Sequence, residues 1–160
     1  MTSHHTTIYS AESVRRLWPR PLASLWRRLY PQLFDADDLR LSNTQPKNHF
    51  NEWFAAIHLF HRDGAHSLVE KYVYARHKKK AAHLPRIISK VKQAILDDIQ
   101  AEFHVQLPDL LVFMPGNARF WFAEVKGPGD RLSAKQVQSH RAITRRVGVP
   151  VEIIEVKVKR

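Results

Sequence analysis

Two segments decide the fold of this chain: LPDLLVF at residues 107–113 and FAEVKGPGD at residues 122–130. Both segments are rich in apolar residues, and PGNA at residues 115–118 between them is typical of a tight turn. A four-residue loop at these positions pairs Met114 with Arg119. The sequence therefore predicts a β-hairpin whose register can be counted outward from the loop.

This register brings three charged side chains together at the open end of the hairpin. Asp109 falls opposite Glu124, and Lys126 lies on the same face as Glu124, about 7 Å further along the strand. Two such carboxylates can hold a hard divalent cation, and an adjacent lysine can orient a water for attack on phosphorus. On most hairpins these charges would form an exposed ion pair worth about 0 to 1 kcal/mol. Here both strands are apolar enough to be buried on both faces, so their charges need partners or a metal.

The residues around this hairpin resemble a nuclease family. Pro-Asp, the hairpin, EVKGP at residues 124–128 and DRLSAKQ at residues 130–136 look like the virus-type replication-repair nuclease (VRR-NUC) domain of the PD-(D/E)XK nucleases. The similarity is dense over residues 107–156, and a similar segment ends the Fanconi-anaemia-associated nuclease. The resemblance implies an α/β fold with a restriction-endonuclease-like core, in which helices flank a mixed sheet.

The same resemblance implies roles for individual residues. The predicted metal ligands are the Asp109 and Glu124 carboxylates and the Val125 carbonyl, for Mg²⁺ or Mn²⁺. Lys126 corresponds to the catalytic lysine, and Gln136 to the family's glutamine on the following helix, where a capping box also accounts for part of its role. Nucleases of this class often take a further acidic residue from the first helix. We assign that role to Glu52, with Glu70 as the competing candidate.

The composition favours one compact domain that meets a polyanion. The chain has 160 residues, 44% of them hydrophobic, and no cysteine, which excludes disulfides and thiolate zinc sites. No apolar stretch approaches the roughly 20 residues that span a bilayer. The segment MTSHH at residues 1–5 lacks the apolar core of a signal peptide, so we expect action on DNA in the cytoplasm, either of the producing cell or of a target cell.

A net charge of +11 predicts binding to nucleic acid rather than to a membrane, given the nuclease-like hairpin. Part of the charge is clustered, most densely in RHKKK at residues 76–80. The expected DNA contacts come from this run and from the loop and helix that follow the hairpin: Lys78, Lys79, Lys80, Arg131, Lys135, Arg141 and Arg145.

Along the chain, residues 1–46 are predicted to form a basic, aromatic helical appendage with a linker, and residues 47–160 the nuclease domain. Residues 65–103 look like a helical insertion. The apolar spacing predicts helices over residues 10–16, 22–30, 49–62, 85–103 and 133–147, and a final strand over residues 151–158.

Several alternatives remain open at this level. His58, His61 and His66 surround a helix end and could form a zinc or HNH-like site, although histidines on a basic surface are the simpler interpretation. A catalytically inactive nucleic-acid-binding domain is the other alternative. The role can be that of a repair or recombination nuclease selecting DNA structures, a phage or mobile-element enzyme, or an antibacterial effector neutralised by a cognate immunity protein. The oligomeric state can be monomer or homodimer.

Overall fold

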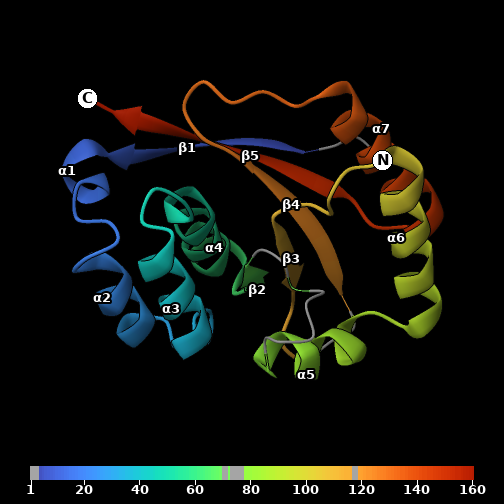
Figure 1. Cartoon of the computed structure of the whole chain (residues 1–160), viewed down its shortest axis with the longest axis horizontal. Coiled ribbons are helices and arrows are strands. Elements are labelled where there is room, and N and C mark those ends of the chain that lie inside the picture. The colour runs from blue at the N-terminus through green and yellow to red at the C-terminus, as the bar shows by residue number, and fades with distance from the viewer. Residues whose placement is uncertain (1–3, 70–71, 73–77, 117–118) are drawn as a thin grey trace.

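A five-stranded mixed sheet forms the centre of the computed structural model, which describes residues 4–69, 72, 78–116 and 119–160 (Figure 1). The strand order is β1-β5-β4-β3-β2. Strand β3 runs antiparallel to β2 and β4, whereas β5 runs parallel to β4 and β1. The bounds are β1 (His5–Ala11), β2 (His66–Val69), β3 (Leu110–Phe113), β4 (Phe120–Lys126) and β5 (Val151–Lys159). The expected α/β fold with a mixed sheet is confirmed.

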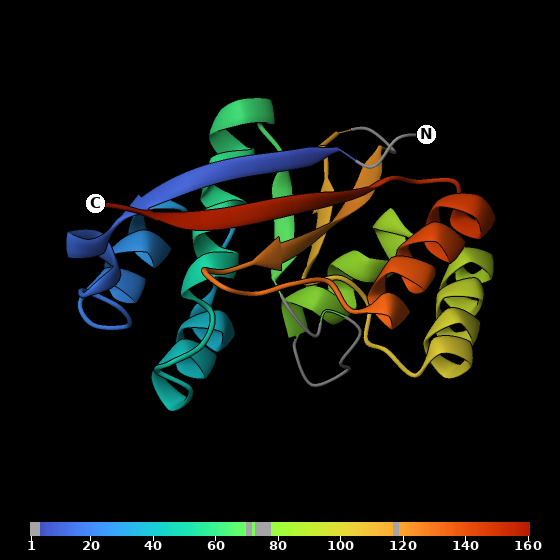
Figure 2. The ribbon, with the colours of Figure 1, turned by 90° about the horizontal axis from the view of Figure 1, so that it is seen from above.

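The helices form two groups on opposite sides of this sheet. Figures 1 and 2 show α1 to α4 on one side and α5 to α7 on the other. Their bounds are α1 (Glu12–Arg15), α2 (Leu22–Leu29), α3 (Ala36–Thr44), α4 (Phe50–Asp63), α5 (Lys78–Ile87), α6 (Lys90–Phe103) and α7 (Ala134–Val147). Among the described residues, no helix has the length and apolar content needed to span a membrane.

Both faces of the sheet are covered by a hydrophobic core. Because side chains alternate along a strand, Leu111 joins one core and its neighbour Val112 the other. The core that includes Val112 is filled by residues of α2 and α4, among them Trp26 and Trp53. The core that includes Leu111 is filled by residues of α6 and α7. The central strands are therefore buried on both sides, as their continuous apolar runs predict.

The predicted hairpin has the predicted register. Leu110 pairs with Ala123 and Phe113 with Phe120. The Met114 N–H donates to the Arg119 carbonyl at 3.0 Å, which closes the hairpin at the expected pair. Residues 117–118 of the turn lie outside the described part of the chain.

The N-terminal segment differs from the expected helical appendage. Its first element is strand β1, which pairs in parallel with β5 from His5 opposite Ile153 to Ala11 opposite Lys159. The expected helix beginning at Ser10 is reduced to α1. Thr, Ile and Tyr in HTTIYSA favour a strand, and main-chain pairing to β5 supplies a partner that is distant in sequence. The later helix α2 buries Trp26 in the same core as Trp53 of α4.

Residues 65–103 also contain more than the expected helices. Strand β2 forms one edge of the sheet, and the predicted helix over 85–103 is divided into α5 and α6. The division occurs at Ser89, whose side chain accepts a hydrogen bond from the Lys92 N–H and caps the N-terminus of α6. Pro85 lies inside α5 rather than in the first turn of a helix.

The basic run contains a correction to the expected DNA surface. Lys80 is only 2% exposed, and its ammonium lies 3.5 Å from the Asp38 carboxylate and donates to the Val69 carbonyl. Lys79 donates to the Leu33 carbonyl at 3.1 Å. A DNA contact by Lys80 is therefore wrong, because a buried ammonium requires partners inside the protein. Lys78 is exposed, and residues 76–77 lie outside the described residues.

We predict that Lys80→Met destabilises the fold by about 3 to 5 kcal/mol, because it leaves the Asp38 carboxylate buried without its ammonium. Lys78→Met removes the same charge from an exposed position two residues earlier in the same helix and serves as the matched control. Urea denaturation followed by circular dichroism measures both variants. Equal unfolding midpoints would show that the buried pair does not stabilise the fold.

Candidate active site

A buried carboxylate lies at the centre of the candidate site. Glu124 on β4 is 5% exposed and is flanked by β3 and β5. Its Oε1 accepts a hydrogen bond from the Gln136 side-chain amide at 2.9 Å and lies 3.1 Å from Lys126 Nζ. Lys126 Nζ in turn donates to Gln136 Oε1 at 3.2 Å. These three side chains form a closed triangle that satisfies the buried charge.

Asp109 is held beside Glu124 by the backbone of β4. It precedes β3 by one residue, and its Oδ2 accepts a hydrogen bond from the Val125 N–H at 2.8 Å. Because Leu110 pairs with Ala123, the same register puts the preceding residue, Asp109, opposite Glu124. The hairpin thus places Asp109, Glu124 and Lys126 at one end of two buried strands, as the sequence predicts. Their chemical roles stay predictions.

The start of helix α7 orients Gln136. The Ser133 side chain accepts from the Gln136 N–H at 3.1 Å, and Gln136 Oε1 accepts from the Ser133 N–H at 3.0 Å. This reciprocal capping box fixes the first turn of the helix. The sequence assigns Gln136 a capping role and a match to the family's glutamine; its side chain caps α7 and also contacts Glu124 and Lys126.

Two residues near Glu124 were not assigned a role from the sequence. His140 lies one helical turn after Gln136, with Nε2 at 3.8 Å from Glu124 Oε2. The i, i+4 spacing on one helix face was an available signal for this placement. Tyr72 donates its hydroxyl proton to the Pro108 carbonyl at 2.9 Å. Burial, followed by the charges of Asp109 and Glu124, raises the pKa of Tyr72 well above its usual value, so the phenol stays neutral.

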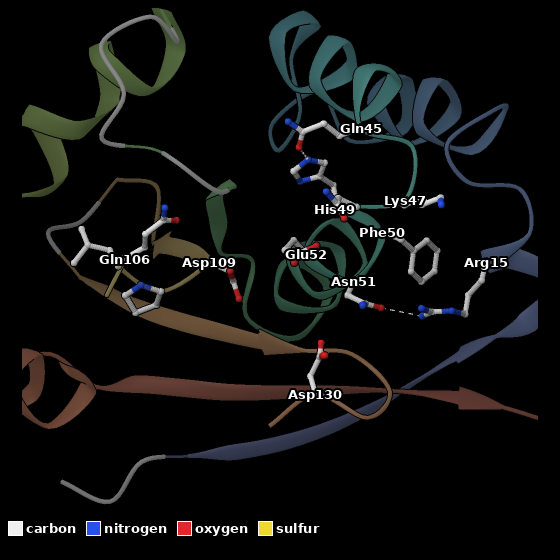
Figure 3. A pocket seen from close by; sticks show the side chains of 13 residues that line it. Arg15, Gln45, Lys47, His49, Phe50, Asn51, Glu52, Gln106, Asp109 and Asp130 are labelled. Carbon is white, nitrogen blue, oxygen red and sulfur yellow. Dashed lines mark hydrogen bonds between the residues drawn. The ribbon is translucent and has the colours of Figure 1, made fainter. Parts of the chain in front are cut away.

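A polar cavity of about 480 Å³ opens beside Asp109. Figure 3 shows Glu52 from α4, Asp109 and Asp130 around this cavity. Asp130 accepts a hydrogen bond from the Gly127 N–H at 3.0 Å. Arg15, Lys47 and Asn51 are among the other residues that line the cavity. Sequence reasoning missed Arg15 and Asn51 because they come from elements remote from the hairpin; Asp130 was visible in the quoted motif but received no role.

The donor set fits a hard divalent cation that is completed by substrate. In the described part of the chain, no three His, Asp or Glu side chains are grouped closely enough to hold a metal. Mg²⁺, however, usually binds through one or two carboxylates and takes its other ligands from water and substrate phosphates. Asp109 and Glu124 supply two such carboxylates. Glu52 and the Val125 carbonyl stay predicted ligands, and Glu70 lies outside the described residues.

The histidine cluster is not brought together as a metal site. The His61 ring hydrogen-bonds to the Tyr30 hydroxyl at 2.8 Å. His66 packs against the rings of Phe60 and Phe113. His58 is partly buried, and burial, followed by the charge of Arg62, lowers its pKa. The described residues therefore give no support to an HNH-like site.

The predicted basic contacts after the hairpin are on the surface. Four of the predicted cations follow the hairpin and are exposed: Arg131, Lys135, Arg141 and Arg145. Arg131 lies in the loop between β4 and α7, and the other three lie on α7. Arg146 on the same helix instead forms a two-point pair with Glu102 of α6, at 2.7 and 3.3 Å. The surface of α7 can therefore present cations to a polyanion, while Arg146 ties it to α6.

Comparison with known proteins shows which family this chain belongs to. Residues 57–158, more than half of the chain, match the model of the VRR-NUC domain. The chain belongs to the VRR-NUC domain family. The solved structures that resemble the chain include a crystal structure of paFAN1 bound to 2nt 5′ flap DNA with a gap. It is 21% identical over 87% of this chain and 23% of that chain, with a TM-score of 0.42. The chain thus spans less than a quarter of paFAN1, and the search of curated proteins found no match.

The family match places this VRR-NUC chain among nucleases. One part of the candidate site lies inside the matched residues, and another part lies before them. Asp109, Glu124, Lys126 and Gln136 lie inside the matched residues. The matched region begins within α4, so Glu52 and the rest of the cavity wall contributed by residues 15–51 lie before it.

We predict that Gln136→Leu destabilises this VRR-NUC fold more than Ser133→Ala. Both changes disrupt the capping box, at a cost of about 0.5 to 2 kcal/mol. Only Gln136→Leu also removes the donor to the buried Glu124 carboxylate, which adds about 1 to 3 kcal/mol. Urea denaturation of the two variants measures the difference. Equal losses would mean that capping alone accounts for Gln136.

Proposed function

We propose that this VRR-NUC domain is a metal-dependent nuclease that hydrolyses phosphodiester bonds in DNA. The observation that carries the proposal is the geometry of the hairpin end. Asp109 is fixed to the β4 backbone beside Glu124, and Gln136 fixes Glu124 and Lys126 to each other. Two carboxylates and an ammonium held in this way suit a divalent cation and a phosphate that meet at one point.

The metal ligands would be Asp109 and Glu124, with the Val125 carbonyl and Glu52 completing the set. A bound Mg²⁺ or Mn²⁺ would supply a Lewis acid for the phosphate and would lower the pKa of a water. The hydrogen bond from Val125 to Asp109 and the one from Gln136 to Glu124 orient the carboxylates before a cation arrives. This preorganisation favours a hard cation with several open positions for substrate oxygens.

Lys126 acts at the reacting phosphate. Its ammonium is held 3.2 Å from Gln136 Oε1 and 3.1 Å from Glu124 Oε1, which leaves one of its three donors for a water or a phosphate oxygen. In that position it orients the attacking water or neutralises the negative charge that develops on phosphorus. Gln136 serves as a positioning residue, since it touches Glu124 and Lys126.

DNA is the proposed substrate because of charge. The net charge of +11 and the exposed cations Arg131, Lys135, Arg141 and Arg145 favour contacts to the phosphate backbone, which give affinity without sequence readout. Selection of DNA structures, the choice between a repair, phage or antibacterial effector role, a cognate immunity protein and the monomeric or dimeric state stay predictions from the sequence.

A catalytically inactive binding domain is the less economical alternative. A protein that only binds nucleic acid has no need for a buried Glu124 carboxylate facing Asp109, since each buried charge costs free energy that apolar packing would avoid. The intact set of Asp109, Glu124 and Lys126 therefore favours catalysis.

We predict that cleavage of linear, flap and branched DNA requires Mg²⁺ or Mn²⁺ and is lost in EDTA. The physical reason is that two adjacent carboxylates repel the phosphate unless a cation lies between them. Gel analysis of products with each metal and with chelator tests this. Full cleavage in EDTA would rule out the proposed mechanism.

We further predict that Glu124→Gln or Lys126→Met lowers the cleavage rate at least about 10²-fold, the scale on which one preorganised charged group acts. Binding to DNA in EDTA should be retained, because it depends on the dispersed basic surface. Glu102→Gln and Lys90→Met are matched controls: each removes the same type of charge from an exposed position outside the site. Normal cleavage by folded Glu124→Gln would contradict the assigned role.

A further inference from the structure

Arg15 is anchored between the N-terminal strand and helix α4. Its Nη1 donates to the Ser10 hydroxyl at 3.0 Å and to Asn51 Oδ1 at 2.9 Å, the latter visible as the dashed line in Figure 3. Ser10 is itself buried and donates to the Lys157 carbonyl of β5 at 3.3 Å. The Arg15 guanidinium is therefore held from one side by the sheet, through Ser10, and from the other by α4, through Asn51.

An aromatic ring fixes the plane of the same guanidinium. The Arg15 Cζ lies 4.5 Å from the centroid of the Phe50 ring, and Phe50 is buried at the start of α4. A guanidinium over an aromatic face keeps its remaining N–H groups directed along the plane of the fork. Arg15 is thus preorganised to donate to a planar or tetrahedral oxyanion.

No carboxylate neutralises Arg15. Among the described residues, three arginines show what such neutralisation looks like: Arg16 lies 3.1 Å from Glu12, Arg62 2.6 Å from Glu152, and Arg146 2.7 Å from Glu102. Arg15 has no such ion pair in this part of the chain, and neither its Nε nor its Nη2 has a hydrogen-bond acceptor there. Partial burial lowers its pKa, since the site desolvates the cation without supplying an anion.

Arg15 lines the same cavity as Asp109 and Glu52, two of the proposed metal ligands. Arg15 and Lys47 contribute to one part of the lining, and Glu52 and Asp109 to another (Figure 3). An anion beside Arg15 would therefore lie next to the scissile phosphate held at Asp109. A polynucleotide strand offers such an anion, because each reacting phosphate is followed by another along the backbone.

Asn51 connects Arg15 to the loop after the catalytic lysine. A Cβ atom at Gly127 would lie 2.4 Å from Asn51 Nδ2, so a larger residue here would displace the Asn51 side chain. Asn51 therefore contacts Arg15 through its oxygen while its amide nitrogen packs against the residue that follows Lys126. This contact sets the position of Arg15 relative to the reacting centre.

We propose that Arg15, assisted by Lys47, forms a phosphate-binding subsite for the nucleic-acid strand next to the cleaved bond. This inference rests on the proposed nuclease function and extends it, since both residues lie before the region matched by the family model. The bound group is a phosphate, either an internal phosphodiester or a terminal phosphate monoester. The competing explanation is that Arg15 only attaches α1 to α4.

The first experiment measures DNA binding in EDTA over a series of salt concentrations. Arg15→Gln is compared with Arg16→Gln, which removes the same charge from the neighbouring exposed arginine that is paired with Glu12. Loss of one phosphate contact reduces the slope of log K against log salt by about 0.9 on duplex DNA and about 0.7 on single strands. We expect this reduction for Arg15→Gln and for Lys47→Gln, and a smaller one for Arg16→Gln.

The second experiment locates the phosphate. Duplexes that carry one neutral methylphosphonate at successive positions around the mapped cleavage site are bound to wild type and to Arg15→Gln. At one position the neutral linkage should weaken the wild type but not the variant, because the same contact cannot be lost twice. Duplexes ending at that position with a phosphate or a hydroxyl distinguish a terminal monoester from an internal phosphodiester.

The outcomes separate the subsite from the nuclease proposal. Equal slopes for Arg15→Gln, Lys47→Gln and Arg16→Gln, or independent effects of protein and DNA changes at every position, would overturn the subsite while leaving cleavage intact. Absence of DNA binding by the wild type would also overturn it. If the wild type binds with the expected coupling but does not cut in Mg²⁺, the subsite stands and the nuclease proposal fails. Should Arg15→Gln unfold, as judged by circular dichroism, Lys47→Gln decides the result, because Lys47 is exposed.

Discussion

The buried carboxylate of Glu124 is the constraint on which the rest of the site depends. A carboxylate buried this deeply must be hydrogen-bonded. Its partners come from the last residue of β4 and from helix α7. Gln136 provides the amide and Lys126 the ammonium. The first turn of α7 therefore has to begin where it does, and the loop between β4 and α7 has to bring Gln136 back to the sheet. The fold and the proposed chemistry therefore require the same placement of Gln136 beside Glu124.

The hairpin supplies the second half of this constraint. Strands β3 and β4 are buried on both faces, so a shift of their register by one residue would exchange the two cores and expose apolar side chains. The same register places Asp109 at the Val125 N–H. Packing energy thereby holds the two carboxylates at the same end of the hairpin.

The N-terminal segment completes one wall of the cavity beside the hairpin. Strand β1 pairs with β5, and Arg15 ends the short helix α1 that follows it, so pairing at the edge of the sheet determines where this guanidinium lies. Helix α4 contributes Asn51 and Glu52 from consecutive positions, one to the cationic part of the lining and one to the acidic part. A part of the chain outside the family match thus contributes to the cavity lining beside Asp109.

The sequence by itself determined the hairpin, its register and the start of α7, because these depend on short-range patterns: apolar runs around a turn, alternation along strands and a capping box. It could not determine that Lys80 is buried against Asp38, that β1 joins β5, that His140 reaches Glu124 or that Arg15 faces Asp109 across a cavity. Each of these depends on segments far apart in the chain. A lysine in a basic run has the same sequence pattern whether it is solvated or buried, and only the tertiary structure supplies the distant carboxylate or carbonyl that decides between them.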